Sequence, residues 1–175
     1  FDDKIKDKQV VSEIVKAVEI MSLKKIGALI VIEQGTKIND IVREGVDLSA
    51  KVSSELIQTI FNPRTPLHDG AIIIEGNQIK AAKCVLPLAS ENIIPKNVGT
   101  RHRAAVGISE VSDALVIVVS EETGTISFVE DGKMKRDLTG DKLTSMLLRS
   151  FDNNRERVSV AKAKKKLESD NIDKE

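Results

Sequence analysis

The chain has 175 residues, a length typical of a single domain with a substantial buried core. Basic and acidic residues number 27 each, so the net charge is zero and no global basic field attracts nucleic acid. Only 2% of the residues are aromatic, with no Trp or Tyr, so an open aromatic platform for a nucleobase is excluded unless one of the four Phe supplies it.

The first part of the chain is predicted to form a helix and then a buried strand. Apolar residues within 7–25 recur at three- and four-residue spacing with Lys and Glu between them, which is typical of an amphipathic helix. Residues 27–32 are apolar on both faces, which predicts a central strand of a sheet. A turn is expected at 34–36, and residues 37–52 fit both a helical turn and a short strand.

A short helix and a hairpin are predicted next. The helix starts at Ser53 and ends before Pro63, because proline disfavours helical geometry in the residue before it. Two prolines stiffen the following loop, which leads a His-Asp-Gly sequence to the start of a strand at 71–74. A hairpin turn connects this strand to a second one at 79–86, and a polar loop follows at 88–98.

The second half of the chain repeats the alternation of helix and strand. After a helix that starts near residue 100, an apolar strand is predicted at 114–119 and a hairpin at 125–135. Thr139 is a candidate cap for a last helix that ends at Phe151. Strands interleaved with helices predict an α/β (α+β) fold, in which helices flank a mixed central sheet in one globular domain.

The end of the chain differs in composition. From Asn153 onward it is charged and poor in large apolar residues, although residues 161–167 have helical character. Its lysines are more simply explained by a solvated tail than by a nucleic-acid site. We therefore expect a catalytic domain over 1–155 and a charged tail over 156–175.

The sequence Gly99-Thr100-Arg101-His102-Arg103 places cations at a predicted helix start, with Thr100 as the expected N-cap. Such a start favours acidic residues, and each cation there costs about 0.3–1 kcal/mol. A bound polyanion would remove the conflict by accepting hydrogen bonds from the backbone N–H groups and both guanidinium groups. We interpret the segment as a phosphate site. The alternative is a surface Arg-x-Arg pair neutralised by nearby acids.

Two acidic segments are candidates to complete such a site. In His68-Asp69-Gly70, a carboxylate just before a buried strand can hold a divalent metal or accept a hydroxyl proton, and the glycine permits close backbone approach. The alternative is an ordinary turn. In Ser120-Glu121, which continues into a second glutamate, the acids can complete a metal site while the serine contacts phosphate. The alternative there is a solvated charged turn.

Familiar phosphate and metal motifs are missing. The chain has no Walker or dinucleotide glycine motif, no H-E-x-x-H sequence and no paired cysteines. The single cysteine, Cys84, excludes an intramolecular disulfide and suits a reducing compartment. No apolar run approaches the about 18 residues of a membrane span.

Taken together with their spacing, the Asp-Gly-Ala, Gly-Thr-Arg-His-Arg and Ser-Glu-Glu-Thr-Gly segments resemble the diadenylate cyclase (DAC) domain, which makes cyclic di-AMP from two ATP molecules. The longer matches are residues 61–71 and 99–105, and the resemblance extends from about Val10 to Phe151. It is closest to the membrane-bound branch, whose cyclase domain follows transmembrane helices. We therefore expect the full-length protein at the cytoplasmic face of the cell membrane, and the part printed here to be soluble.

The resemblance implies roles for particular residues. Catalytic residues would be Asp69, Arg101, His102 and Arg103. Residues that bind substrate would be Leu29, Gly70, Ala71, Leu86, Thr100, Arg101, His102, Arg103, Ser120 and Glu121. A divalent metal, Mg or Mn, would be held by Asp69, with His68 and Glu122 as further ligands. One departure is Val85, where some relatives have a tyrosine that stacks on adenine.

Within these roles, Asp69 would also help to polarise the attacking ribose 3′-hydroxyl. Thr100 to Arg103 and Ser120 would bind the triphosphate, whereas Gly70, Ala71 and the Leu86 backbone would border the adenine beside Leu29. The implied reaction needs a face-to-face homodimer, with a phosphoglucosamine mutase and a membrane regulator as further partners and no nucleic acid. The alternative function is a non-catalytic module that senses ATP or a cyclic dinucleotide.

Overall fold

The computed structural model of the chain describes residues 2–89 and 99–174. The helices are α1 (Asp2–Lys24), α2 (Ser54–Phe61), α3 (Thr100–Glu110) and α4 (Gly140–Ile172). The strands are β1 (Ala28–Ile32), β2 (Val46–Lys51), β3 (Ala71–Glu75), β4 (Gln78–Cys84), β5 (Leu115–Val119), β6 (Ile126–Glu130) and β7 (Lys133–Lys135). Within the described residues the strands form one sheet in the order β2-β4-β3-β1-β5-β6-β7. β1 pairs in parallel with β3, and the other pairings are antiparallel, so the sheet is mixed as predicted.

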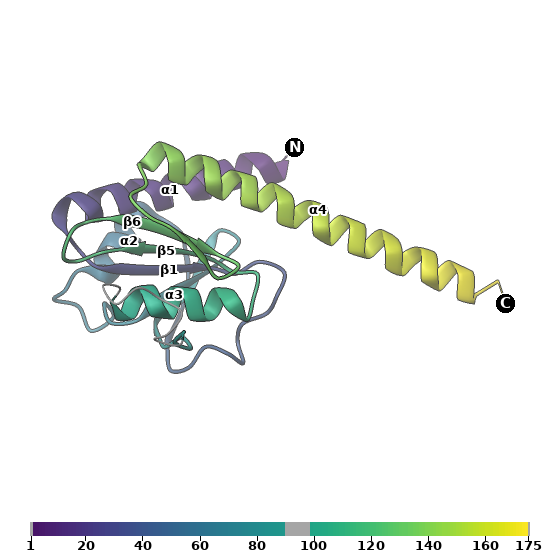
Figure 1. Ribbon diagram of the computed structural model, residues 1–175, viewed down its shortest axis with the longest axis horizontal. Coiled ribbons are helices and arrows are strands. Elements are labelled where there is room, and N and C mark those ends of the chain that lie inside the picture. Colours follow the sequence, from purple (N-terminus) through teal and green to yellow (C-terminus); the bar gives the residue numbers. More distant parts are fainter. Residues whose placement is uncertain (1, 90–98, 175) are drawn as a thin grey trace.

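The sheet separates two apolar clusters. α1 and α4 lie side by side over one face, and α3 lies over the other (Figure 1). Alternate residues of β1 serve the two clusters: Ile30 belongs to the cluster under α1 and α4, whereas Val31 belongs to the one under α3. All five residues of β1 are buried, which confirms the prediction of a central strand.

Side-chain caps define where two of the helices begin. The Ser53 hydroxyl accepts a hydrogen bond from the Leu56 N–H at 3.1 Å, and Thr139 accepts one from the Lys142 N–H at 3.2 Å. Each bond satisfies one of the N–H groups that a helix start leaves without an intrahelical partner. Both starts agree with the sequence prediction.

Three element boundaries differ from the sequence prediction. α1 begins at Asp2 rather than at residue 7, and the ambiguous 37–52 segment contains β2. α4 does not end at Phe151 but continues through the charged segment, which is rich in the strong helix formers Lys, Ala and Glu. From residue 156 to 174 the side chains are exposed. The predicted polar loop falls mostly on 90–98, outside the described residues.

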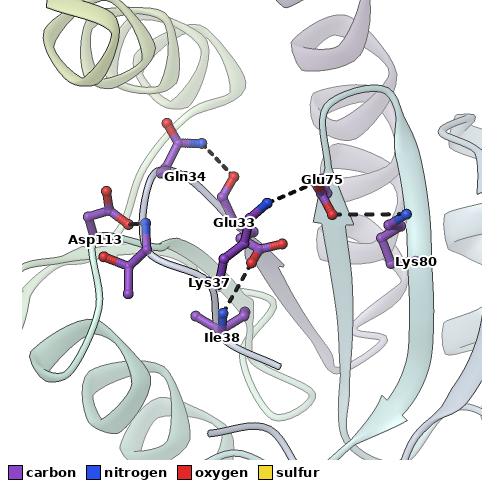
Figure 2. A network of polar contacts seen from close by, with 8 residues as sticks. Glu33, Gln34, Lys37, Ile38, Glu75, Lys80 and Asp113 are labelled. Atoms are coloured by element: carbon purple, nitrogen blue, oxygen red, sulfur yellow. Dashed lines mark hydrogen bonds and ion pairs between the residues drawn. The ribbon is translucent and has the colours of Figure 1, made fainter. Parts of the chain in front are cut away.

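A polar network holds the loop that follows β1 (Figure 2). The buried carboxylate of Glu33 accepts a hydrogen bond from the Ile38 N–H at 3.1 Å. Asp113, just before β5, accepts bonds from the Gly35 and Thr36 N–H groups at 2.9 Å each. These bonds satisfy backbone N–H groups of the loop that follows β1. They therefore hold the loop in place at this end of the strand. Among the described helices, none is long and apolar enough to cross a membrane.

Candidate active site

A cleft of about 1040 Å³ opens at the other end of β1. At this edge of the sheet β1 and β3 begin, β4 and β5 end, and α3 starts. The cleft is lined by most of the predicted site residues, namely Leu29, His68, Asp69, Gly70, Leu86, Thr100, Arg101, His102, Ser120, Glu121 and Glu122. Its volume is at the upper end of the range for small-molecule sites. Three segments that are distant in the sequence, 68–70, 99–102 and 120–123, therefore meet in one cleft.

The start of α3 lies in this cleft without a side-chain cap. The N-cap is Gly99, not Thr100 as predicted, and within the described residues the helix start has no side-chain cap hydrogen bond. Thr100 is the first helical residue, so its hydroxyl is not committed to capping and lines the cleft instead. The first turn contains no acidic residue. The donor groups and the positive end of the helix dipole are therefore available to an anionic ligand.

The guanidinium group of Arg101 lies close to a carboxylate across the cleft. Its Nη1 atom is 3.6 Å from Oε1 of Glu121, which follows β5. The Glu121 side chain is 65% exposed, so solvent screens this pair and its contribution to stability is small. This ion pair agrees with the alternative interpretation, in which nearby acids neutralise the arginines. Arg101 nevertheless lines the cleft.

His102 is a buried imidazole in the wall of the cleft. The residue is 6% exposed, and its buried Nε2 atom has no hydrogen-bond partner among residues 2–89 and 99–174. Burial, followed by the positive charges of Arg136 and Arg101, lowers the pKa of His102. The imidazole is therefore held neutral at physiological pH. The Nε2 atom is thus a buried polar group whose hydrogen-bonding capacity is unused within the described part of the chain.

Arg136 is a cleft residue that the sequence analysis missed. It follows β7, lines the cleft and lies close enough to His102 to influence its pKa. Nothing in its local sequence distinguishes it from other surface arginines. Its position depends on the β6–β7 hairpin, which lies next to α3 and donates a hydrogen bond from the Gly132 N–H to the Ser109 hydroxyl at 2.9 Å.

We expect the substitution Arg136→Ala to raise the pKa of His102. Of the two positive charges that disfavour the imidazolium form, Arg136 has the larger effect, and the substitution removes it. The chain has two histidines, so an NMR titration of the imidazole protons resolves both, and a His68→Gln variant assigns them. The matched control is Lys133→Ala on the same hairpin, which should leave the His102 titration unchanged. An unaltered His102 titration in Arg136→Ala would contradict the proximity described here.

His68 and Asp69 form a two-group donor set at the cleft mouth. Nδ1 of His68 lies 2.8 Å from the Thr65 carbonyl oxygen, which can only accept, so Nδ1 carries the proton. In the neutral ring Nε2 then presents a lone pair, and it lies 3.3 Å from Oδ1 of Asp69. Two acceptor atoms facing each other need a proton or a cation between them. The Asp69 side chain is 79% exposed, so other ligands can approach such a cation.

Gly70 allows two backbones to approach each other at this corner. Its φ is +99°, and a Cβ there would lie 2.6 Å from the Cys84 carbonyl oxygen. The close approach is therefore to the end of β4. The thiol of Cys84 is buried, and burial, with a smaller contribution from Asp47, raises its pKa to about 11. Cys84 is thus an inert packing group.

The segment after β5 forms a tight turn organised by Ser120. Its hydroxyl oxygen accepts hydrogen bonds from the N–H groups of Glu122 and Thr123 at 3.2 and 3.3 Å. The hydroxyl proton therefore remains available to a phosphate oxygen in the cleft. The turn of the alternative interpretation is present and it lines the cleft, whereas a contact of Ser120 with phosphate stays a prediction.

The predicted three-ligand metal site is not assembled. Across residues 2–89 and 99–174, no group of three or more His, Cys, Asp or Glu side chains is arranged to hold a metal ion. His68 and Asp69 are in contact, whereas Glu122 lies on the exposed turn that Ser120 fixes. A cation at His68 and Asp69 would need oxygen ligands from a substrate, which suits Mg²⁺ because it is commonly bound by one or two carboxylates and phosphate oxygens.

Two predicted residues do not line the cleft. Ala71 is fully buried at the start of β3. Arg103 donates a hydrogen bond from Nη2 to the Ala89 carbonyl oxygen at 3.3 Å, and the Ala89 N–H donates to the Arg103 carbonyl oxygen at 3.1 Å. Helical periodicity separates Arg103 from Arg101 on the helix surface, so the two guanidinium groups do not share one wall.

Apolar groups complete the cleft. Phe61, at the end of α2, lines it but is only 1% exposed, so it forms part of the floor and not an open stacking platform. Val85 lines the cleft too and is 47% exposed. The sequence identified Phe61 as one of four aromatic candidates but gave no reason to select it. The apolar part of the cleft surface is therefore mainly aliphatic.

Comparisons with known proteins place the chain in a family. Residues 15–134 match the family model described as "DisA bacterial checkpoint controller nucleotide-binding" (DAC). Cyclic di-AMP synthase CdaA of Bacillus subtilis is 51% identical over 144 residues, which are 82% of this chain and 53% of that protein. A diadenylate cyclase of Listeria monocytogenes is 47% identical over 141 residues, which are 81% of this chain and 52% of that protein.

A solved structure has the same fold. A double mutant of DacA from Staphylococcus aureus superimposes with a TM-score of 0.78 at 46% sequence identity, covering 82% of this chain and 95% of that one. The chain spans about half the length of the curated relatives it matches. The family model nevertheless covers most of the sheet, α3 and the cleft. The chain therefore belongs to the diadenylate cyclase (DAC) family.

Proposed function

We propose that this protein is a nucleotidyltransferase, a diadenylate cyclase that condenses two ATP molecules into cyclic di-3′,5′-AMP and two pyrophosphates. The observation that carries the proposal is one cleft in which the uncapped, cation-bearing start of α3 and the Asp69 carboxylate are both present. Members of the family are named for this reaction. The two features supply what the reaction needs, a binding site for a triphosphate and a group that can accept a hydroxyl proton.

The start of α3 is the proposed triphosphate site. Its N–H groups, the Thr100 hydroxyl and Arg101 are available donors, and the Ser120 hydroxyl lies in the same cleft. Together they would neutralise charge on the phosphates and orient the α-phosphorus for attack. The neutral His102 forms part of the cleft wall beside this site, and Arg136 supplies a further positive charge.

Asp69 is the proposed acceptor of the ribose 3′-hydroxyl proton and, with His68, the proposed holder of a divalent metal. The facing lone pairs of these two groups fit a cation, and their exposure leaves room for phosphate oxygens. When bound, Mg²⁺ or Mn²⁺ supplies positive charge that stabilises the leaving pyrophosphate and favours the alkoxide form of the hydroxyl. The family is metal-dependent, and the identity of the metal is a prediction. Glu122 is proposed only as a group that joins once substrate is bound.

The adenine is proposed to lie on aliphatic surface. Leu29, at the start of β1, and Leu86, just after β4, line the cleft, and Gly70 brings its backbone close to the end of β4 at Cys84. Val85 offers a branched aliphatic side chain where a stacking ring would contribute about 1–3 kcal/mol per base. We therefore expect base recognition to depend on shape and on backbone groups.

The reaction requires two copies of the domain. Each 3′-oxygen forms a bond to the α-phosphorus of the other ATP, and each attack breaks the bond to the β-phosphate and releases pyrophosphate. Each cleft contains one helix start as a triphosphate site, so we propose that each chain binds one ATP and that two chains bring their clefts face to face. Positioning and charge neutralisation would supply most of the acceleration.

The activity is tested by incubating the chain with ATP and Mn²⁺ or Mg²⁺. We expect pyrophosphate and a phosphatase-resistant product with the mass of cyclic di-AMP. ATP binding without either product would overturn the proposal and favour the alternative, a nucleotide-sensing module.

The homodimer is tested by mixing wild-type chain with an excess of the Asp69→Asn chain at saturating ATP. If chains pair at random, activity per wild-type chain should fall in proportion to the wild-type fraction. A linear, triphosphorylated dinucleotide should accumulate, because a mixed pair makes one of the two bonds. Serum albumin at the same concentration is the control. Unchanged cyclic product per wild-type chain would contradict the homodimer.

We also propose that the complete protein acts at the cytoplasmic face of the cell membrane. A solved structure that covers 73% of this chain, at a TM-score of 0.71 and 42% identity, is that of a hypothetical membrane spanning protein from Bacillus cereus. The phosphoglucosamine mutase and the membrane regulator stay predictions from the resemblance.

A further inference from the structure

We propose that Gly27, just before β1, is a positioning residue that aligns the Arg101 guanidinium group in the cleft by having no side chain. The inference rests on the proposed function, because it concerns how the triphosphate site is arranged. Gly27 lines the cleft but carries no group that reacts or forms ion pairs. Its role must therefore be sought in the space that it leaves.

The space at Gly27 is filled by Arg101. A Cβ built on Gly27 would lie 2.5 Å from Nη1, 2.6 Å from Cζ and 2.9 Å from Nη2 of Arg101. Three atoms of the guanidinium group lie at similar distances, so the group occupies the space in which a Cβ would lie. The positive-φ glycines in the described part of the chain do not include Gly27, so an alanine is compatible with its backbone conformation. Space, and not backbone freedom, is the requirement here.

The sheet fixes the other side of the same guanidinium group. Glu121 lies 3.6 Å from Nη1 of Arg101, two residues after the end of β5. β1 and β5 pair antiparallel with Ala28 opposite Val119, so Gly27 and the turn that contains Glu121 are neighbours across that pair. The arginine side chain is 26% exposed. The guanidinium group is thus confined between Gly27, at the start of β1, and the turn that follows the neighbouring strand β5.

The three heavy atoms nearest to a methyl group at Gly27 all belong to the Arg101 guanidinium group, which such a methyl group must displace. The contacts are with the far end of a flexible side chain, so the helix and strands need not move. The overlap requires a shift of roughly 1 Å, and a misplacement of that size in a catalytic group can cost about 100-fold in rate. The substitution Gly27→Ala should therefore separate the position of Arg101 from the stability of the fold.

Gly140 provides a matched control. A Cβ built there would lie 2.5 Å from Cδ of Glu19 and 2.8 Å from each of its carboxylate oxygens. The near-contact is again with the far end of one charged, exposed side chain. Gly140 is the first residue of α4, which packs with α1, and it does not line the cleft. Gly140→Ala therefore reproduces the steric change outside the site.

The experiment compares wild type, Gly27→Ala, Gly140→Ala, Arg101→Ala and the double variant Gly27→Ala/Arg101→Ala. For each protein, kcat/KM for cyclic di-AMP formation, the Kd for ATP and the Tm are measured. We expect Gly27→Ala to lower kcat/KM by about 10- to 100-fold and to weaken ATP binding, with Tm within about 2 °C of wild type. Gly140→Ala should leave kcat/KM within about twofold of wild type.

The double variant provides the decisive comparison. If Gly27 acts through Arg101, the substitution Gly27→Ala should have no further effect once the guanidinium group is gone, so the two losses should not multiply. Multiplied losses, or wild-type kinetics in Gly27→Ala, would overturn the proposal. If Gly27→Ala fails to fold, the double variant should fold again, and its failure to do so would overturn the proposal as well. An inactive wild-type chain would overturn the proposed function instead, and the ATP Kd values would still decide on Gly27.

Discussion

Replacing Asp69 by asparagine is expected to lower the rate of cyclic di-AMP formation by about 1000-fold or more, with the fold intact. Asparagine has the same shape but carries no charge and cannot accept a proton from the 3′-hydroxyl at neutral pH. It also removes the only carboxylate that contacts His68 in the described part of the chain. Both the proton acceptor and the cation site are therefore lost together. A coupled pyrophosphate assay with saturating ATP and Mn²⁺ measures the effect.

The stability of the Asp69→Asn protein should be unchanged, because the carboxylate is 79% exposed and makes no other ion pair or hydrogen bond among the described contacts. The matched control is Asp131→Asn on the β6–β7 turn. Asp131 has a φ of +51°, a conformation that asparagine adopts readily, so this variant should retain full activity. Retained activity in Asp69→Asn would require a different residue as the proton acceptor.

Replacing Gly107 by alanine is expected to destabilise the domain by about 3 kcal/mol or more, although alanine is the better helix former by about 1 kcal/mol. A Cβ at this position in α3 would lie 2.8 Å from the carbonyl carbon and closer still to the carbonyl oxygen of Pro87, and 3.0 Å from the N atom of Ala89. These are backbone atoms of a segment that hydrogen bonds to Arg103, so they cannot move independently of α3. The steric cost therefore exceeds the gain in helix propensity.

Thermal unfolding measures this effect, and a loss of that size lowers Tm by about 10 °C for a domain of this length. Activity should fall as well, because the same segment follows Leu86 in the cleft wall. Gly140→Ala is again the control, since it lies in a helix and the three atoms nearest to its new methyl group belong to the Glu19 carboxylate. A Tm for Gly107→Ala equal to that of Gly140→Ala would contradict this prediction. It would show that the backbone of residues 87–89 can move away from α3 at little cost.

Local sequence patterns predicted most of the sheet but only part of the cleft. The strands around β1 were predictable because apolar residues on both faces require a central position, and the hairpins were predictable from their turn residues. The helix cap was wrong because a hydroxyl residue at a helix start serves equally well as N-cap or as first residue. Which of these it becomes depends on how the preceding chain enters.

Residues that reach the cleft through tertiary packing were not predictable from local patterns. Arg136 arrives there on a hairpin placed against α3, and Phe61 arrives at the end of α2. Conversely, Arg103 belongs to the same motif as Arg101 but faces Ala89, because successive helical residues point in different directions. A linear motif therefore overstates how many of its side chains share one surface.

The length of α4 makes the far end of the chain useful as a probe site. Seventeen residues of this helix, 156–172, lie beyond the packed part, and at 1.5 Å per residue they extend about 25 Å from it. Backbone amides in that stretch should exchange with deuterium far sooner than those next to α1, which gives an internal clock for local opening. The fluorescence anisotropy of a fluorophore attached near Ile172 would report the rotational diffusion of the whole protein. It would therefore detect the pairing of two chains without a label in the nucleotide cleft.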